Sequence, residues 1–365
     1  MSFRFRGRPS GAGRTQQGRL VVYCWDLDKT YLRTEFDTVG QLLRVPFQRP
    51  EDKVEVPGVV ELIRALKPCA QRTGRTARIF FLSASPPQIG RAIRAKLALD
   101  EVPYDGIVFK NQLKYLVRGK FHNLREQVGF KLGELLRNRH AQPADAEEVL
   151  FGDDWESDAV TYSMYADTLA RRIDLAALRR LLDRARVDPK VAEEVLTLAA
   201  TVEPADGVRR IFVNLERRTP PLSFRRLGPR VVPTFNYFQT AAMLHADGYI
   251  DRAAVVRVAR SLVERAGYTA DHLVNSLADL CRRGHLARAD EIVIRHRLVR
   301  DGLLRAVPKG GTVQRLRTRV KVGLRVLGWR WRRRGVLDAS SIGAPVDYDA
   351  VLAELDGARR VRGAK

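Results

Sequence analysis

Short apolar runs alternate with helix-like segments along the first half of the chain, and this alternation limits the possible folds more than any other feature. Strands that alternate with helices are typical of α/β proteins with a parallel sheet. The sequence therefore predicts a doubly wound parallel sheet. The predicted strands are residues 20–26, 77–83, 106–109 and 147–152, with a weaker run at 167–171. The predicted helices are residues 57–72, 86–99, 124–138 and 155–165.

The second half of the chain has a different character, because after about residue 175 its apolar residues recur mainly at helical spacing. A segment rich in proline and arginine, residues 217–234, is predicted to be a loop or linker. The predicted helices are residues 189–201, 235–246, 251–266, 270–283 and 286–299. We divide the chain into a disordered basic arm (1–18), an α/β domain (19–176), a mainly helical domain (177–308) and a basic amphipathic region (309–365).

The chain is strongly basic, with 65 Lys and Arg against 42 Asp and Glu, a net charge of +23. A field of that sign attracts anionic lipid, nucleic acid or phosphorylated substrates. An arginine-rich bias in the source proteome is the alternative explanation.

No run of about 20 apolar residues and no secretory signal are visible. The three cysteines fit neither a disulfide framework nor a zinc site. We therefore expect a cytoplasmic protein, with peripheral membrane contact as a further option.

Residues 309–335 contain ten basic residues and no acidic one. Apolar residues recur there at helical spacing, and Trp329 and Trp331 suit a lipid interface. Such a segment fits peripheral contact with an anionic membrane, binding to nucleic acid, or packing on its own domain. These three alternatives stay open.

Two carboxylates stand directly after the first apolar run, in Asp26-Leu27-Asp28. Residues two apart in a strand point to the same side, so the two like charges crowd each other. A divalent cation or a shared proton relieves such crowding. The sequence thus predicts a metal and nucleophile site at the end of the strand, and the alternative is a strand followed by an ordinary polar turn.

Polar groups also follow two of the later predicted strands. Residues 78–82 lead into Ser83 and Ala84, and residues 149–151 lead into a cluster that runs from Gly152 to Asp158. In open parallel sheets, ligands bind beyond the carboxyl ends of the strands. We therefore expect these groups to gather with Asp26 in one site.

Together these motifs resemble the haloacid dehalogenase superfamily of phosphohydrolases. A closer resemblance is to the actin-patch-type phosphatidate phosphatase catalytic domain. It rests on Ser83-Ala84-Ser85-Pro86, on Gly152-Asp153 with Asp158 and Tyr162, and on Phe130-Lys131-Leu132. It covers roughly residues 19–176 and implies a Rossmann-like phosphatase core. Two positions depart from that subgroup, since Lys29 stands where an Asp is usual and Pro87 where a Trp is usual.

The resemblance implies a role for each acidic residue. Asp26 matches the nucleophile that forms an aspartyl-phosphate, which splits hydrolysis into two easier steps. Asp28 would protonate the leaving oxygen and later deprotonate water. Asp26, Asp153 and a backbone carbonyl of Asp28 resemble a Mg²⁺ site. Asp158 matches the second acidic metal position.

The same resemblance supplies the phosphate-binding groups. Ser83 and the neighbouring Ala84 would bind the transferring phosphoryl group, and Thr30 would order the turn after Asp28. Lys131 would balance the charge on Asp26 and the phosphate. Lys110 is the competing candidate for that lysine.

These observations predict a Mg²⁺-dependent phosphomonoester hydrolase, with phosphatidate or a related phospholipid as the first substrate to test. The alternative is a basic nucleic-acid-binding protein. Residues 251–288 have the spacing of a helix-turn-helix or winged helix. In that case the phosphatase domain would act on nucleic-acid ends or be incidental. Oligomeric state is not predicted.

Overall fold

The computed structural model of the chain describes residues 19–27, 30–31, 55–83, 90–109, 124–155, 157–305 and 346–354. Predicted features at residues 1–18 and 309–335 lie outside these ranges. No helix of the described residues is long and apolar enough to cross a membrane.

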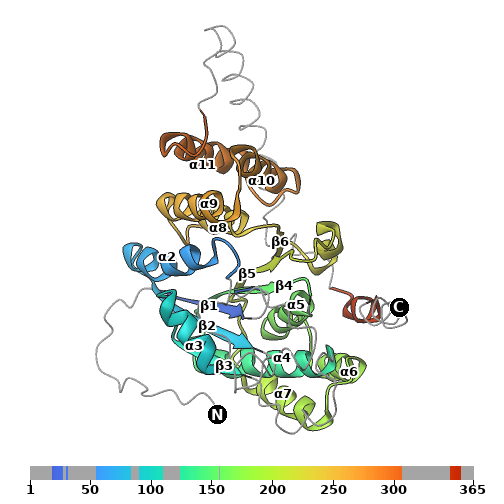
Figure 1. The fold of residues 1–365 in the computed structure, drawn as a ribbon. Coiled ribbons are helices and arrows are strands. Elements are labelled where there is room, and N and C mark those ends of the chain that lie inside the picture. The colour runs from blue at the N-terminus through green and yellow to red at the C-terminus, as the bar shows by residue number, and fades with distance from the viewer. Residues whose placement is uncertain are drawn as a thin grey trace.

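One six-stranded sheet forms the centre of the described structure, and all neighbouring strands in it run parallel (Figure 1). Its order is β3-β2-β1-β4-β5-β6. The order reverses between β1 and β4, which is where ligands bind in doubly wound sheets. The predicted fold class is therefore confirmed. The strands are β1 (Leu20–Asp26), β2 (Thr76–Ser83), β3 (Gly106–Phe109), β4 (Glu147–Asp153), β5 (Val208–Asn214) and β6 (Val231–Thr234).

Helices cover both faces of the sheet, and residues of β1 alternate between the two cores. Val21, Tyr23 and Trp25 belong to the first core, whereas Val22 and Cys24 belong to the second. A strand that is apolar on both sides fits only a sheet covered on both faces. The first core contains residues of α2 (Val59–Arg72), α3 (Gly90–Leu99), α8 (Tyr237–Ala246), α9 (Arg252–Ala266), α10 (Ala270–Arg282) and α11 (Arg288–Arg300). The second contains residues of α4 (Leu124–His140), α5 (Asp158–Leu169), α6 (Leu175–Arg184), α7 (Pro189–Thr201) and the 3₁₀ helix η5 (Pro221–Leu227).

Side-chain caps define where several helices of the second half begin. Asp188 accepts hydrogen bonds from the backbone N–H groups of Lys190 and Val191 in the first turn of α7, and Asp251 accepts one from Ala254 in the first turn of α9. Thr269 and His272 form a capping box at the start of α10. Because a cap satisfies amide groups that the helix leaves unpaired, these helices begin within two residues of their predicted starts.

The structure corrects two predictions of secondary structure and adds two elements that were not predicted. Residues 167–171 are not a strand, because residues 167–169 are the end of α5 and residues 170–171 form the turn after it. The twelve residues of α5 are all buried and therefore show no helical periodicity. Residues 217–234 contain η5 and β6 rather than only a linker. The helix α6 and the strand β5 were not predicted.

The sheet continues beyond the expected boundary at residue 177. The strand β5 pairs with β4 in parallel, and β6 pairs with β5. Most of residues 177–308 is helical, as predicted, but this part of the chain also completes the central sheet. The division into domains at that residue stays a prediction.

Candidate active site

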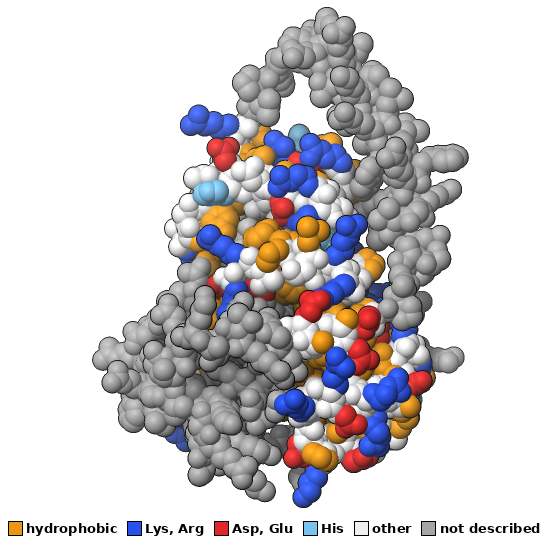
Figure 2. All heavy atoms as spheres, turned by 90° about the vertical axis from the view of Figure 1, so that its right-hand side faces the viewer, with side chains coloured by type: hydrophobic (Ala, Val, Ile, Leu, Met, Phe, Trp, Pro, Cys, Tyr) orange, Lys and Arg blue, Asp and Glu red, His pale blue; other side chains and the backbone are white. Residues whose placement is uncertain are grey.

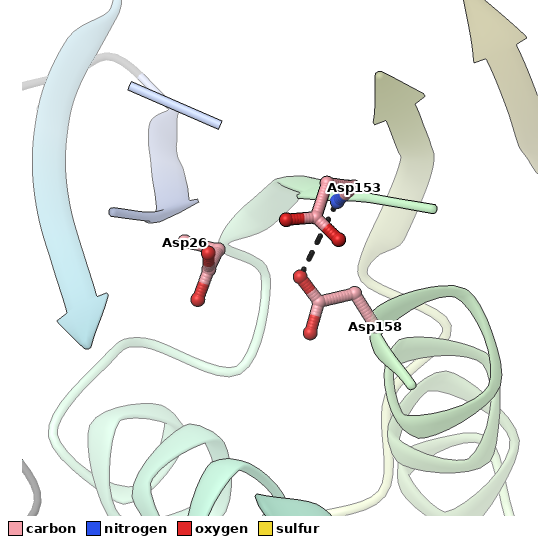
Figure 3. Close-up of side chains that lie close together, drawn as sticks. All are labelled: Asp26, Asp153 and Asp158. Atoms are coloured by element: carbon pink, nitrogen blue, oxygen red, sulfur yellow. Dashed lines mark hydrogen bonds between the residues drawn. The ribbon is translucent and has the colours of Figure 1, made fainter. Parts of the chain in front are cut away.

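Three buried carboxylates meet at the carboxyl edge of the sheet (Figure 3). Asp26 is the last residue of β1, Asp153 is the last residue of β4, and Asp158 is the first residue of α5. Each is fully buried. One carboxylate oxygen from each lies within 4.8 Å of the other two. Neighbouring β1 and β4 bring together acids that are more than a hundred residues apart in the sequence.

Lys131, on α4, reaches the same cluster from the second core. Its Nζ lies 2.8 Å from Oδ1 of Asp26, and it donates a hydrogen bond to Oδ1 of Asp158. Its side chain is fully buried. A buried ammonium group is stable only when it is paired, and these two carboxylates provide that pairing. The competing candidate, Lys110, lies outside the described residues.

Backbone geometry between β4 and α5 holds the acidic cluster in shape. The backbone N–H of Asp153 donates to Oδ2 of Asp158 at 3.4 Å, and that of Trp155 donates to Oδ1 of Asp153 at 2.7 Å. A Cβ atom at Gly152 would lie 2.5 Å from both the Cβ and Oδ2 of Asp158. Only glycine therefore allows Asp158 to approach the strand this closely.

The turn after β1 and the end of β2 lie beside the cluster. The N–H of Leu27 donates to the carbonyl of Leu82 at 2.9 Å, which fixes the direction in which the chain leaves β1. Ser83 ends β2 and is fully buried, and Thr30 is fully buried as well. Asp28 and Ala84 lie outside the described residues, so their predicted roles stay predictions.

Residues from the second half of the chain also contact this turn. The hydroxyl of Tyr237, at the start of α8, donates to the carbonyl of Thr30 at 2.7 Å and accepts from Nε1 of Trp25 at 3.4 Å. The ring of Trp25 in turn stacks on Phe151, with centroids 3.5 Å apart. The sequence analysis missed Tyr237. A contact across 207 positions leaves no local pattern that could have pointed to it.

Tyr162 of α5 places a buried hydroxyl near the cluster. Burial raises its pKa well above the ordinary value, and the charge of Asp158 acts in the same direction. The phenol is therefore neutral at physiological pH and adds no negative charge beside the carboxylates.

The donor atoms of the cluster fit a hard divalent cation. Three carboxylates meet one ammonium group, that of Lys131, among the described residues of the site. Carboxylate oxygens are the ligands that Mg²⁺ prefers, and a divalent charge offsets the remaining repulsion. Asp153 and Asp158 can supply oxygens together with Asp26. Asp154, by contrast, accepts hydrogen bonds from the backbone N–H groups of two residues that follow β5.

Comparison with known proteins agrees with this chemistry. Residues 22–180 match the family model described as phosphatidate phosphatase APP1, catalytic domain, which is less than half of the 365-residue chain. None of the curated proteins matches the chain. The match confirms the resemblance found in the sequence, and its range contains Asp26, Ser83, Lys131, Asp153 and Asp158, whose individual roles stay predictions. Residues 22–180 are therefore similar to the catalytic domain of phosphatidate phosphatases of the APP1 type, and this match indicates that the protein is a phosphatase.

Proposed function

We propose that this domain is a Mg²⁺-dependent phosphomonoesterase that works through an aspartyl-phosphate on Asp26. The observation that carries the proposal is the buried cluster of Asp26, Asp153 and Asp158 with Lys131. Burying charged carboxylates this close together costs free energy unless a bound cation offsets their charges. Asp26, Asp153 and Asp158 would hold Mg²⁺. The ion would neutralise charge on the transferring phosphoryl group.

Asp26 would act first, as the nucleophile. A carboxylate oxygen of Asp26 forms a bond to phosphorus while the bond from phosphorus to the ester oxygen breaks, and Asp28 gives its proton to that oxygen. In the second step Asp28 takes a proton from water. The water oxygen bonds to phosphorus, and the bond to Asp26 breaks, which releases inorganic phosphate and restores both carboxyl groups.

Lys131 would keep Asp26 in the ionised form that can attack phosphorus. Its Nζ lies 2.8 Å from Oδ1 of Asp26 and therefore favours the ionised carboxylate. Once the phosphoryl group is attached to Asp26, the same ammonium group would offset part of its charge. Ser83, at the neighbouring strand end, would donate its hydroxyl to a phosphoryl oxygen.

The substrate we propose is phosphatidate or a related phospholipid that carries a phosphomonoester. The family description supports this choice. The net charge of +23 also favours an anionic substrate presented on an anionic surface. Whether residues 309–335 contact that surface stays a prediction.

The test is phosphate release from phosphatidate vesicles, nucleotides, phosphopeptides and 3′-phosphorylated DNA, with Mg²⁺ or with a chelator. The full chain, its Asp26→Asn variant and an Asp145→Asn control are compared, since Asp145 is exposed at the opposite edge of the sheet. We expect wild type and Asp145→Asn to release phosphate from phosphatidate only with Mg²⁺, and Asp26→Asn to lose at least about a thousandfold in rate. Equal release by wild type and Asp26→Asn from every substrate would refute the mechanism.

A further inference from the structure

An exposed leucine lies on the segment that follows β5. Leu222 is 75% exposed, more than any other large hydrophobic residue in the described ranges. It belongs to residues 216–226, which run from the end of β5 into η5 and which we call the rim segment. Residues close by face the other way, since Leu227 is buried in the second core and Phe224 packs against that core. The exposure of Leu222 is therefore local to the tip of the segment.

The rim segment is hydrogen-bonded directly to the loop that follows Asp153, the acidic residue at the end of β4. The carboxylate of Asp154 accepts hydrogen bonds from the backbone N–H groups of Arg217 and Thr219, each at 2.9 Å. The guanidinium of Arg217 lies 4.1 Å from the ring centroid of Trp155. Because Asp154 and Trp155 directly follow Asp153, these contacts place the rim segment beside the acidic cluster.

Arginines surround the exposed leucine on both sides along the chain. Arg217 and Arg218 precede Leu222, Arg225 and Arg226 follow it, and all four are exposed. Arg226 forms an ion pair with Glu354 at 2.6 Å. Figure 2 views the molecule from the right-hand side of Figure 1, and hydrophobic side chains lie there among lysines and arginines, with acidic side chains between them. An apolar tip with basic side chains around it is complementary to a bilayer whose headgroups are anionic.

We propose that the rim segment docks the protein on an anionic phospholipid bilayer, with Leu222 entering the acyl boundary and Arg217 and Arg218 contacting headgroup phosphates. The inference deepens the proposed function, on which it rests, by naming the surface that delivers the lipid to the site. Pro220 and Pro221 restrict the backbone in front of Leu222, so little conformational entropy is lost when the tip inserts.

Nucleic acid is the other polyanion that the arginines could attract. Binding to the phosphates and base edges of nucleic acid removes little of one exposed aliphatic side chain from water. Insertion into a bilayer removes the whole side chain from water and therefore contributes more binding free energy. The position of Leu222 at the tip therefore favours the membrane.

The experiment measures binding to vesicles without any hydrolysis. The full chain carrying Asp26→Asn is sedimented with vesicles of phosphatidate in phosphatidylcholine and with vesicles of phosphatidylcholine alone. In that background we expect Leu222→Ala to weaken binding to the anionic vesicles about tenfold. Arg218→Ala is expected to weaken it about fivefold at low salt, with a smaller effect at high salt.

Leu99→Ala is the matched control. Leu99 is 53% exposed at the end of α3, which leads into the start of β3 and so lies at the opposite edge of the sheet. Its substitution is expected to leave vesicle binding unchanged. Thermal unfolding of each variant shows whether the fold is kept.

The outcomes separate this proposal from the proposed function. Tight binding by the parent that Leu222→Ala does not weaken would overturn the rim segment as the docking surface. Absence of binding to anionic vesicles, together with phosphate release from short-chain soluble phosphatidate by wild type, would overturn the docking while the enzyme function stands. Loss of binding by Leu222→Ala without any phosphate release by wild type would support the docking and refute the function. Binding of duplex DNA that the phosphatidate vesicles do not displace would assign the arginines to nucleic acid and overturn the proposal.

Discussion

Replacing Lys131 by methionine tests the electrostatic balance of the site most directly. Methionine keeps most of the length and apolar volume of the side chain but removes its charge. The Nζ of Lys131 lies 2.8 Å from Oδ1 of Asp26, and both side chains are buried. At an effective dielectric constant of about 20, this separation corresponds to an attraction of about 6 kcal/mol. Desolvation of the two ions offsets much of that energy.

The variant leaves carboxylates buried without their ammonium partner. Breaking a buried pair from one side costs about 3–5 kcal/mol, because the remaining charge has lost its compensation. We expect the free energy of unfolding to fall by about this amount when divalent cations are absent. Since Mg²⁺ binds the same carboxylates in our proposal, adding it is expected to restore part of the loss and to stabilise Lys131→Met more than wild type.

Lys96 offers a matched control on a helix that covers the other face of the sheet. It is also a buried lysine between two acids, with Nζ at 2.9 Å from Oε2 of Glu55 and 2.7 Å from Oδ1 of Asp100. It lies on α3, outside the acidic cluster. Lys96→Met is expected to lower stability equally with and without Mg²⁺ and to keep phosphatase activity.

Urea unfolding of the three proteins, with Mg²⁺ and with a chelator, measures these effects, and phosphate release measures the loss of activity in Lys131→Met. The reasoning is refuted if Lys131→Met unfolds within about 1 kcal/mol of wild type in the chelator. It is equally refuted if Mg²⁺ stabilises Lys131→Met no more than it stabilises Lys96→Met.

Two further substitutions test other parts of the structure. Gly152→Ala places a Cβ 2.5 Å from the Cβ of Asp158 and is expected to lower phosphatase activity and to cost about 1–3 kcal/mol in unfolding free energy. Gly133→Ala, whose added Cβ has its nearest neighbour at 3.6 Å, is the control, and equal effects of both would contradict the steric argument. Burial lowers the pKa of His285 to about 4, and the charge of Arg283 adds to this shift. The unfolded chain takes up that proton near pH 6.5, so the stability contributed by the neutral ring is complete above pH 6.5 and is lost as the pH falls toward 4. His285→Gln is expected to lose stability less steeply than wild type over this range in thermal unfolding, and identical slopes would contradict the assignment.

The sequence predicted the first four strands well because each is a short apolar run that stops at a polar residue. It did not predict β5 and β6. In β5 the run is interrupted by Arg209 and Arg210, which pair with Glu147 and Asp247, so tertiary contacts satisfy charges that argue locally against a strand. In β6 only four residues pair, and Pro233 is one of them. Proline is unusual in a strand, which made a linker the natural prediction.

The acidic residues of the candidate site were predictable from the sequence, but the residues that hold them in place were not. Asp26, Asp153 and Asp158 stand at strand and helix ends, where the topology of a parallel sheet brings them together. The reason for Gly152 became visible only when the position of Asp158 was known. The hydroxyl of Tyr237 donates a hydrogen bond to the turn after β1. Tyr237 lies outside the residues that match the family model, so no motif includes it.

The pairing of β5 with β4 means that the residues matched to the catalytic family cannot be cut out as an independent unit. A fragment that ends at residue 180 would expose the whole edge of β4, whose seven residues are all buried in the full chain. An apolar strand with a free row of backbone donors and acceptors is a template for aggregation. The strand that ends in Asp153 would thus become the edge through which copies of the fragment aggregate.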